Sequence, residues 1–482
     1  MGLLGLASTG ICSMLGASIY VVPFMIQRNV PGIGPYVLPA FTFAAIPAVL
    51  AALAYSILAS AMPRAGGSYI YASRGLHPYL GFIASFSQWF GLSIIIGVVS
   101  YVIPPFARDI ASALNWPDLA AALDKGTIRV VVSLSILWFF VWINIRGVTV
   151  YEKTVVPLMV LMFILGAIVI IAGYSHTFDD FAKALQDSQG RTVIPEEGQF
   201  DTGIFLSASA ILFSSFIGFD SIAQAGGEAK NPGRNLPLAI GIAVVSVGSF
   251  YMLFTGAVYH TVPWNYVAQE AASRDITAPG MMSMLLSPGW TIAIIAGAGV
   301  ALTNDLPAML LSCSRLMFAW AEDGIFPKTI TQVNTKYKTP HIAILLSGAM
   351  ASIGILGSHF AGDFFLGVDI MVTSMLVNFL LMCASVLWLP GRNPALASEI
   401  RFMKDRHLQR IVAGTGVVIL SGFLVIHIAK DLGAASKAWY FHSTPMWLIV
   451  MALASAIYWR ETKRLKKSGV DMKTLFSTLP PE

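Results

Sequence analysis

Long apolar runs separated by short polar stretches dominate this chain of 482 residues. A helix needs about 20 apolar residues to cross a bilayer, and runs of that length recur about twelve times. They lie near residues 4–26, 36–60, 80–106, 128–145, 154–173, 203–225, 236–260, 291–320, 341–357, 364–389, 410–429 and 444–460. Only 11% of the residues are charged. The pattern therefore predicts an all-α polytopic membrane protein with about 12 transmembrane helices.

Two of the runs contain residues that a continuous lipid-facing helix does not need. The sixth run carries Gly218 and Asp220, and the first carries small residues at 16–18 followed by Pro23. Backbone that opens within hydrocarbon must line a protein cavity or bind something, because its polar groups find no water there. The alternative for the sixth run is a kinked helix in which Gly218 allows close packing and Asp220 is paired with a neighbour.

The first interruption creates a helix N-terminus inside the membrane. Pro23 removes an amide donor and pushes against the turn before it, so we expect the helix to open near residues 16–18. The second half-helix then begins with free amides at Ala17, Ser18 and Ile19. Amides at the positive end of a helix dipole bind anions, and a carboxylate fits such a site.

The two interrupted runs are five runs apart. Paired broken helices in corresponding positions of two halves indicate an inverted-repeat transporter whose site lies at the bilayer midplane. We therefore divide the chain into a first repeat at 1–173 (helices 1–5), an extracellular loop at 174–202 and a second repeat at 203–390 (helices 6–10). Residues 391–482 form helices 11 and 12 and a basic cytoplasmic tail.

The distribution of charge predicts the orientation. Most of the 30 Lys and Arg residues fall on one side of the membrane if both termini share that side, whereas acidic residues crowd the loop at 174–202. Cytoplasmic loops retain basic residues, so we expect a multi-pass protein of the cell membrane with both termini in the cytoplasm. The net charge of +5 then reflects topology rather than nucleic-acid binding, and the tail contacts membrane lipid. Residues 1–7 carry no basic region, which argues against a cleaved signal peptide.

Groups suited to catalysis are scarce. The three cysteines, Cys12, Cys313 and Cys383, all lie in apolar runs, and the eight histidines fall in loops or near the ends of runs. This arrangement supports neither a disulfide framework nor a thiolate metal site. The sequence therefore predicts no enzyme, no cofactor and no metal centre.

Charged residues in and after the eighth run are further candidates. An ionisable group deep in a membrane span marks an ion pathway or a binding site, which is the interpretation favoured for Asp305. The alternative places Asp305 at the external surface, beyond the true end of the span. Arg315 and Asp323 form a cytoplasmic latch on one interpretation, and on the other Arg315 extends to the interface as a snorkelling side chain.

Four stretches together resemble the amino acid–polyamine–organocation family of transporters. They are residues 16–20 (GASIY), residues 63–69 (PRAGGSY), residues 216–220 with Glu228, Asn231, Pro232 and Pro237, and residues 315–327 with Thr339 and Pro340. The resemblance extends over the first ten runs. It implies the leucine-transporter (LeuT) type of fold, a 5+5 inverted repeat with broken helices 1 and 6 unwound around the substrate, and an amino acid permease that works by alternating access.

The resemblance also implies a site. The substrate carboxylate would meet the amides near Ala17 and Ser18, and the ammonium would meet carbonyls near Met14, Ser214 and Ile217. The full set of substrate-binding candidates is Met14, Gly16, Ala17, Ser18, Ile19, Gly91, Ile96, Ser214, Ile217, Gly218 and Met309. The coupling or gating candidates are Asp220, Phe219, Tyr20, Thr303 and Asp305.

Two departures from the family pattern bear on specificity and coupling. Ser18 stands where the family commonly has glycine, and Met162 stands where proton-coupled members carry a lysine. Coupling to a proton or a sodium ion then lies elsewhere, with Thr303 and Asp305 as the candidates, or the protein is an exchanger or a uniporter. The small and apolar lining favours a neutral amino acid, but a polyamine or cationic amine becomes the better substrate if Asp220 or Asp305 faces the pocket. An ion channel, or an amino acid sensor without transport activity, is a further candidate function.

Overall fold

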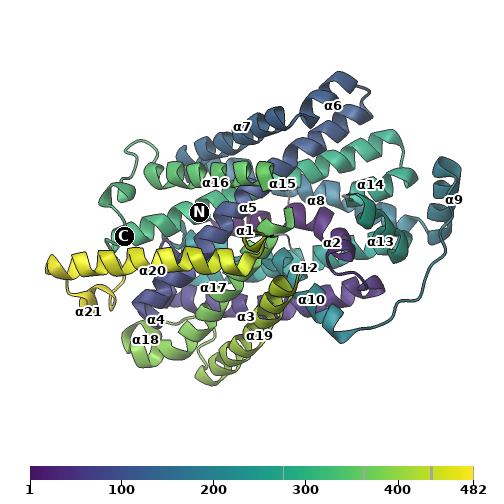
Figure 1. Cartoon of the computed structure of the whole chain (residues 1–482). Helices are drawn as coiled ribbons and strands as arrows, with labels where there is room; N and C mark the ends of the chain where they lie inside the picture. The colour runs from purple at the N-terminus through teal and green to yellow at the C-terminus, as the bar shows by residue number, and fades with distance from the viewer. Residues whose placement is uncertain (275, 362–363, 435–437, 481–482) are drawn as a thin grey trace.

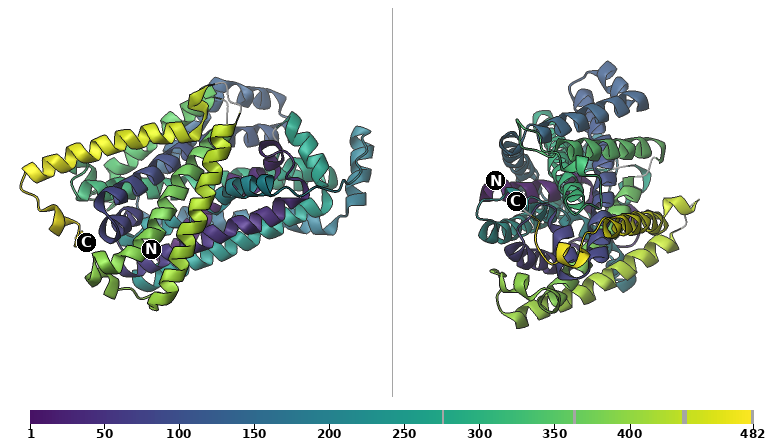
Figure 2. Two further views of the ribbon diagram at one scale, coloured as in Figure 1. Left: turned by 60° about the horizontal axis from the view of Figure 1, so that its bottom comes forward. Right: turned by 90° about the vertical axis from the view of Figure 1, so that its left-hand side faces the viewer.

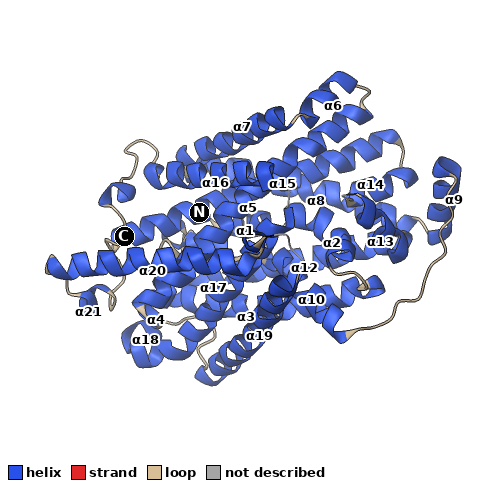
Figure 3. Ribbon diagram, in the orientation of Figure 1, coloured by secondary structure: helices blue, strands red, loops and turns tan. Residues whose placement is uncertain are grey.

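The computed structural model describes residues 1–482 except 275, 362–363, 435–437 and 481–482. The described chain is a bundle of helices, most of which run along a common direction (Figure 1). Helices and the loops between them make up all that is drawn for the described residues in Figure 3. The only strand-like pairing among the described residues is one isolated bridge between Ala65 and Ala225.

Eleven segments of the described chain are long and apolar enough to cross a membrane. They are α1 (Leu3–Met14) with α2 (Ala17–Asn29), α3 (Val37–Ala61), α5 (Pro78–Ala113), α7 (Gly126–Ile145), α8 (Val148–Ser175), α10 (Thr202–Leu212) with α11 (Asp220–Gln224), α12 (Pro232–Thr261), α15 (Pro288–Glu322), α16 (His341–Ala361), α17 (Phe364–Arg392) and α19 (Arg406–Gly433). The multi-pass, all-helical architecture predicted from the apolar runs is therefore confirmed.

The twelfth predicted run forms α20 (Ser443–Lys467), which is long but is not one of these eleven segments. Its apolar part contains Trp447, Tyr458 and Trp459 and is followed at once by the charges that begin at Arg460. The mean hydropathy of its most apolar stretch is therefore lower than that of the eleven segments. Figure 2 shows α19 and α20, in yellow-green and yellow, at the periphery of the bundle.

Shorter helices connect the spans. They are α4 (Gly67–Gly75), α6 (Pro117–Asp124), α9 (Phe178–Gln189), α13 (Trp264–Ser273), α14 (Ala278–Met282), α18 (Pro394–Ser398) and α21 (Met472–Leu475). The polar loop expected at 174–202 contains α9, whose first turn is closed by a capping box between Thr177 and Asp180. The hydrogen bonds from Thr177 hold the pKa of the exposed Asp180 carboxyl below its usual value.

Two groups of helices meet around the centre of the bundle. In the first, α12 packs against α1 and α3, and α1 also contacts α11. In the second, α5 packs extensively against α15, α17 and α16. Gly97 of α5 lies so close to α16 that an added Cβ atom would be 2.5 Å from the carbonyl carbon of Gly354, which is the close approach that small residues permit between membrane helices.

Candidate functional site

The first span is interrupted near its middle. Helix α1 ends at Met14 and α2 begins at Ala17, with Leu15 and Gly16 between them. Gly16 has φ −90° and ψ −131°, outside the helical region. The first amides of α2 consequently have no acceptor within their own helix. The side chains of Ala17 and Ser18 lie outside the described part of the structure.

The sixth span is also interrupted, and its break touches the first one. Helix α10 ends at Leu212, a single 3-10 turn covers Phe213–Phe216, and α11 begins at Asp220. Gly218 between them has φ +135°, a conformation that residues with a Cβ atom rarely adopt. A Cβ atom on Gly218 would lie 2.3 Å from the Ser13 carbonyl oxygen and 2.8 Å from the Met14 nitrogen. The glycine therefore lets the two broken spans meet backbone to backbone.

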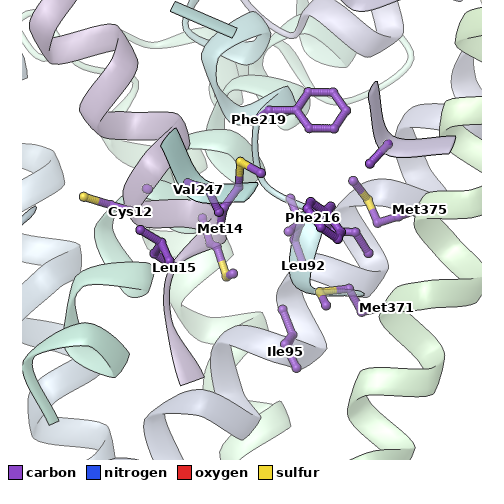
Figure 4. Packing of buried hydrophobic residues seen from close by; sticks show 14 of the residues in the cluster. Cys12, Met14, Leu15, Leu92, Ile95, Phe216, Phe219, Val247, Met371 and Met375 are labelled. Carbon is purple, nitrogen blue, oxygen red and sulfur yellow. The ribbon is translucent and has the colours of Figure 1, made fainter. Parts of the chain in front are cut away.

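An enclosed cavity lies beside this junction. Its lining residues are Ser13, Met14, Val22, Ile95, Val99, Ser214, Ile217, Asp305, Met309, Val368 and Met371. The cavity volume is about 20 Å³, which holds about one water molecule. Figure 4 shows Met14, Ile95 and Met371 among the apolar side chains packed in this region. The site is closed in this conformation, so a ligand the size of an amino acid enters only when helices move apart.

A larger groove opens at the surface elsewhere. Its volume is about 960 Å³, and it lies between the end of α3 and the start of α12, lined by Arg64, Arg234 and Arg401 among others. Neither helix break contributes to its lining. The smaller cavity is the better candidate because two interrupted spans converge on it.

The structure brings five of the candidate residues to the cavity, namely Met14, Ser214, Ile217, Met309 and Asp305. Gly16 and Gly218 lie at the breaks themselves, and Ile19 is buried in the first turns of α2. Asp305 is only 4% exposed, so it does not lie at the external surface. A Cβ atom on Gly16 would be 1.5 Å from Asp305 Oδ2, which places this carboxylate directly beside the first break.

Two candidates on α5 do not line the cavity. Gly91 packs against α17, where an added Cβ atom would be 2.8 Å from the Ser374 Cβ atom. Ile96 is buried, but its neighbours Ile95 and Val99 supply the lining instead. An ungapped alignment to a family pattern fixes helical register only to within a residue, and one residue turns a side chain by about 100°.

The aromatic gating candidates pack away from the cavity. Phe219 stacks on Phe379 at a centroid distance of 5.0 Å and meets Tyr55 edge-on at 5.6 Å. Tyr20 packs edge-on against Phe254 at 5.1 Å. Thr303, a coupling candidate, is outside the lining as well, and its hydroxyl donates to the Gly299 carbonyl of its own helix at 2.6 Å.

Asp220, which begins α11 directly after the break in the sixth span, belongs to a buried polar network. Its carboxylate accepts hydrogen bonds from the Gln88 side-chain amide and from the Gly218 amide, the latter at 3.1 Å. Gln224 extends the network by donating to Gln88 at 3.2 Å and to Ser68 at 2.7 Å. These contacts tie the second break to α4 and α5. Sequence reasoning missed Gln88 and Gln224 because neither residue belongs to a recognisable motif.

Two ion pairs, one buried and one partly buried, lie at the end of the bundle that carries Arg64, Arg74 and Arg315, hereafter the basic end. Asp323 accepts from two nitrogens of Arg74 at 2.6 and 2.8 Å and from the Tyr69 hydroxyl at 2.6 Å. Arg315 pairs with Glu228 and is only 3% exposed. The predicted latch between Arg315 and Asp323 is therefore wrong, because Arg315 pairs with Glu228 and Asp323 pairs with Arg74. Arg315 does not snorkel, because its side chain is buried.

The C-terminal segment closes over the same end. Arg74 donates to the Thr478 carbonyl at 3.2 Å, and its guanidinium lies 5.2 Å from the centre of the Phe476 ring. Burial lowers the pKa of Arg74, but its hydrogen bonds to Asp323 outweigh this effect and the pKa is raised overall. Arg74 thus stays charged at physiological pH. Sequence reasoning treated Arg74 only as a topological charge.

Comparison with known proteins identifies the family. The family model for amino acid permeases matches residues 1–455. The branched-chain amino acid permease BcaP of Bacillus subtilis (strain 168) is 24% identical over 479 residues, covering 97% of this chain and 94% of BcaP. The vacuolar cationic amino acid transporter 2 of Arabidopsis thaliana is 26% identical, covering 72% of this chain and 53% of that protein. Human cationic amino acid transporter 4 is also 26% identical, covering 72% of this chain and 54% of that protein.

The matched segment thus spans about half the length of these cationic amino acid transporters but almost all of BcaP. The relatives are named as permeases and transporters, and the family is not an enzyme family. Its substrates are small molecules of the amino acid class. The chain belongs to the amino acid permease family, within the amino acid–polyamine–organocation transporters.

Proposed function

We propose that this protein carries a neutral amino acid across the cell membrane by alternating access, with both termini in the cytoplasm. The observation that supports the proposal most strongly is the contact between the two interrupted spans, in which Gly218 lies against the backbone of Ser13 and Met14. Unwound half-helices that face one another give a substrate free amides for its carboxylate and free carbonyls for its ammonium. A channel or a scaffold protein does not require two unwound half-helices that face each other.

The lining favours a neutral side chain. Val22, Ile95, Val99, Met309, Val368 and Met371 are all apolar. The one carboxylate, Asp305, lies beside the helix break at Gly16, which is the end expected to bind the substrate backbone. It is therefore no fixed counter-charge for a cationic side chain. BcaP, which matches almost the whole chain, is named for branched-chain amino acids.

A polyamine or cationic amine is the second candidate substrate. Asp305 is a carboxylate in the cavity lining, and it would pair with an ammonium group. Two of the relatives are named for cationic amino acids. The two candidate substrates differ in one chemical group. A neutral amino acid has a carboxylate that can bind at the helix break, whereas a polyamine has none.

Uptake in proteoliposomes by the purified full-length protein distinguishes these candidates. We expect unlabelled L-leucine, L-valine and L-alanine to compete with radiolabelled L-leucine, whereas D-leucine, L-arginine and putrescine do not. Met309→Ala removes part of the apolar lining and should shift preference toward larger side chains by about tenfold, since one or two buried methylenes correspond to about 1–3 kcal/mol. Met317→Ala, on the same helix but outside the lining, should leave the preference unchanged.

Three results would contradict the proposal. Preferential uptake of arginine or putrescine would support the cationic substrate. Ion currents without saturable, stereoselective uptake would indicate a channel, and leucine binding without flux would indicate a sensor.

A further inference from the structure

Asp305 occupies the space beside the break in the first span. The residue lies on α15 and is 4% exposed. A Cβ atom on Gly16 would lie 1.5 Å from its Oδ2 and 2.3 Å from its Oδ1. Gly16 directly precedes Ala17, where α2 begins. A side-chain carboxylate of the protein therefore lies where a half-helix N-terminus attracts an anion.

The charged groups around the N-terminus of α2 favour a single anion at this position. Asp305 is the only charged side chain among the described residues of the cavity lining. The contacting helices α1 and α2 carry Cys12 and Tyr20, and Tyr251 of α12 donates a hydrogen bond to the Met14 carbonyl of the cavity lining; all three residues are buried. Helices α5 and α17 contribute only apolar residues to the described lining, and α8 has no ionisable residue between 154 and 173.

A second polar group of the cavity lining is available to form a hydrogen bond with a ligand. The Ser214 hydroxyl lines the same cavity and has no hydrogen-bond partner among the described residues, although Ser214 is only 3% exposed. A buried hydroxyl without a partner costs free energy, and structures usually avoid this cost. The Ser214 hydroxyl and the Asp305 carboxylate thus border the same small space, one from a broken span and the other from a continuous one.

Resting on the proposed function, we propose that Asp305 is an internal surrogate for the substrate's carboxylate. While the site is empty, Asp305 holds the N-terminus of α2. When an amino acid binds, the substrate carboxylate takes this position and Asp305 moves away and accepts one proton.

The proton follows from the charges. Two carboxylates that share one buried site cannot both remain ionised unless a cation neutralises one of them. The described lining supplies no cation, and in the proposed binding mode the substrate's own ammonium group is bound by backbone carbonyls of the breaks rather than by Asp305. Binding therefore combines one zwitterionic amino acid, one Asp305 carboxylate and one proton, and no bond other than the new O–H bond of Asp305 forms or breaks. Release on the other side reverses the step, so one proton and one positive charge move with each neutral amino acid. Met162, at the position where the family's coupling lysine was expected, needs no role in this cycle.

Proton uptake by the wild-type protein tests the proposal without any substitution. The purified full chain is mixed with L-leucine in weakly buffered detergent solution containing a pH-indicator dye and no sodium. We expect about one proton to be taken up per bound leucine. Leucinol, in which a hydroxymethyl group replaces the carboxylate, should cause no proton uptake. Leucine binding without proton uptake would overturn the proposal, whereas a complete lack of leucine binding would instead contradict the proposed substrate.

Asp305→Asn tests the same step in proteoliposomes, because asparagine cannot take up the proton. We expect the stimulation of leucine uptake by an acidic exterior, which reaches about tenfold per pH unit for one coupled proton, to disappear in Asp305→Asn whatever the absolute rate of leucine counterflow. Asp124→Asn, on the exposed side of α6, should behave as the wild type. Proton-driven uptake that persists in Asp305→Asn would overturn the surrogate role. So would a monodisperse Asp305→Asn protein that no longer binds leucine, since Asp305 would then be part of the binding site itself.

Discussion

Gly218→Ala is expected to abolish transport while the rest of the bundle still assembles. The added Cβ atom would lie 2.3 Å from the Ser13 carbonyl oxygen and 2.8 Å from the Met14 nitrogen. Backbone atoms cannot rotate away as a flexible side chain can, so the two broken spans must separate. The φ of +135° adds a strain that a residue with a Cβ atom rarely tolerates. We expect leucine uptake in proteoliposomes to fall by more than about tenfold, which corresponds to about 1.4 kcal/mol.

Gly241→Ala is the matched control for this substitution. Gly241 lies in α12, and a Cβ atom there would have no neighbour within 4 Å. Its uptake should equal that of the wild type, and helix propensity even favours the change slightly. If Gly218→Ala transports as well as Gly241→Ala, the contact between the two breaks is not needed for function.

Arg74→Ala is expected to destabilise the protein strongly. The Arg74 and Asp323 side chains are 1% and 2% exposed, and removal of one partner leaves the other as a buried charge without its counter-ion. Such a loss typically costs about 3–5 kcal/mol. Of the described partners of Asp323, only the Tyr69 hydroxyl would remain. Thermal unfolding of the purified protein, followed by intrinsic fluorescence, should show a markedly lower Tm.

Two further variants make this prediction specific. The double variant Arg74→Ala with Asp323→Ala removes both charges, so it should be more stable than Arg74→Ala alone. Arg401→Ala breaks a pair that is 3.8 Å long and 71% and 60% exposed, and exposed pairs contribute about 0–1 kcal/mol. Equal Tm values for Arg74→Ala and Arg401→Ala would show that the buried pair does not hold the basic end together.

Local sequence features were enough to predict the class of fold. Apolar runs of bilayer length predict spans because hydrocarbon leaves the backbone no other partner. Gly16, Pro23 and Gly218 departed from that pattern, and the structure interrupts both spans near those glycines. Such exceptions are informative because a glycine in mid-span is tolerated only where backbone geometry or close contact requires it.

Long-range pairing was beyond what the sequence shows. Arg74 and Asp323 are 249 residues apart, and Gln88 and Asp220 are 132 residues apart. Each pair forms only because several helices converge on it. Arg315 and Asp323, which lie close in sequence, suggested a pairing that the structure replaces with two separate ones. The position of Asp305 beside Gly16 likewise depends on how α15 packs against α1, which no local pattern specifies.

Protection of a cysteine at position 214 by substrate tests the central claim most directly. Ser214→Cys is introduced after Cys12, Cys313 and Cys383, all buried, have been replaced by serine, and labelling by a small thiol reagent is timed in proteoliposomes. Ser215→Cys, which lies outside the cavity lining, serves as the control. If the substrate binds between the interrupted helices, saturating L-leucine should slow the labelling of Ser214→Cys at least about fivefold and leave the control unchanged. A Ser214→Cys protein that transports leucine but is labelled at the same rate with and without it would contradict the account.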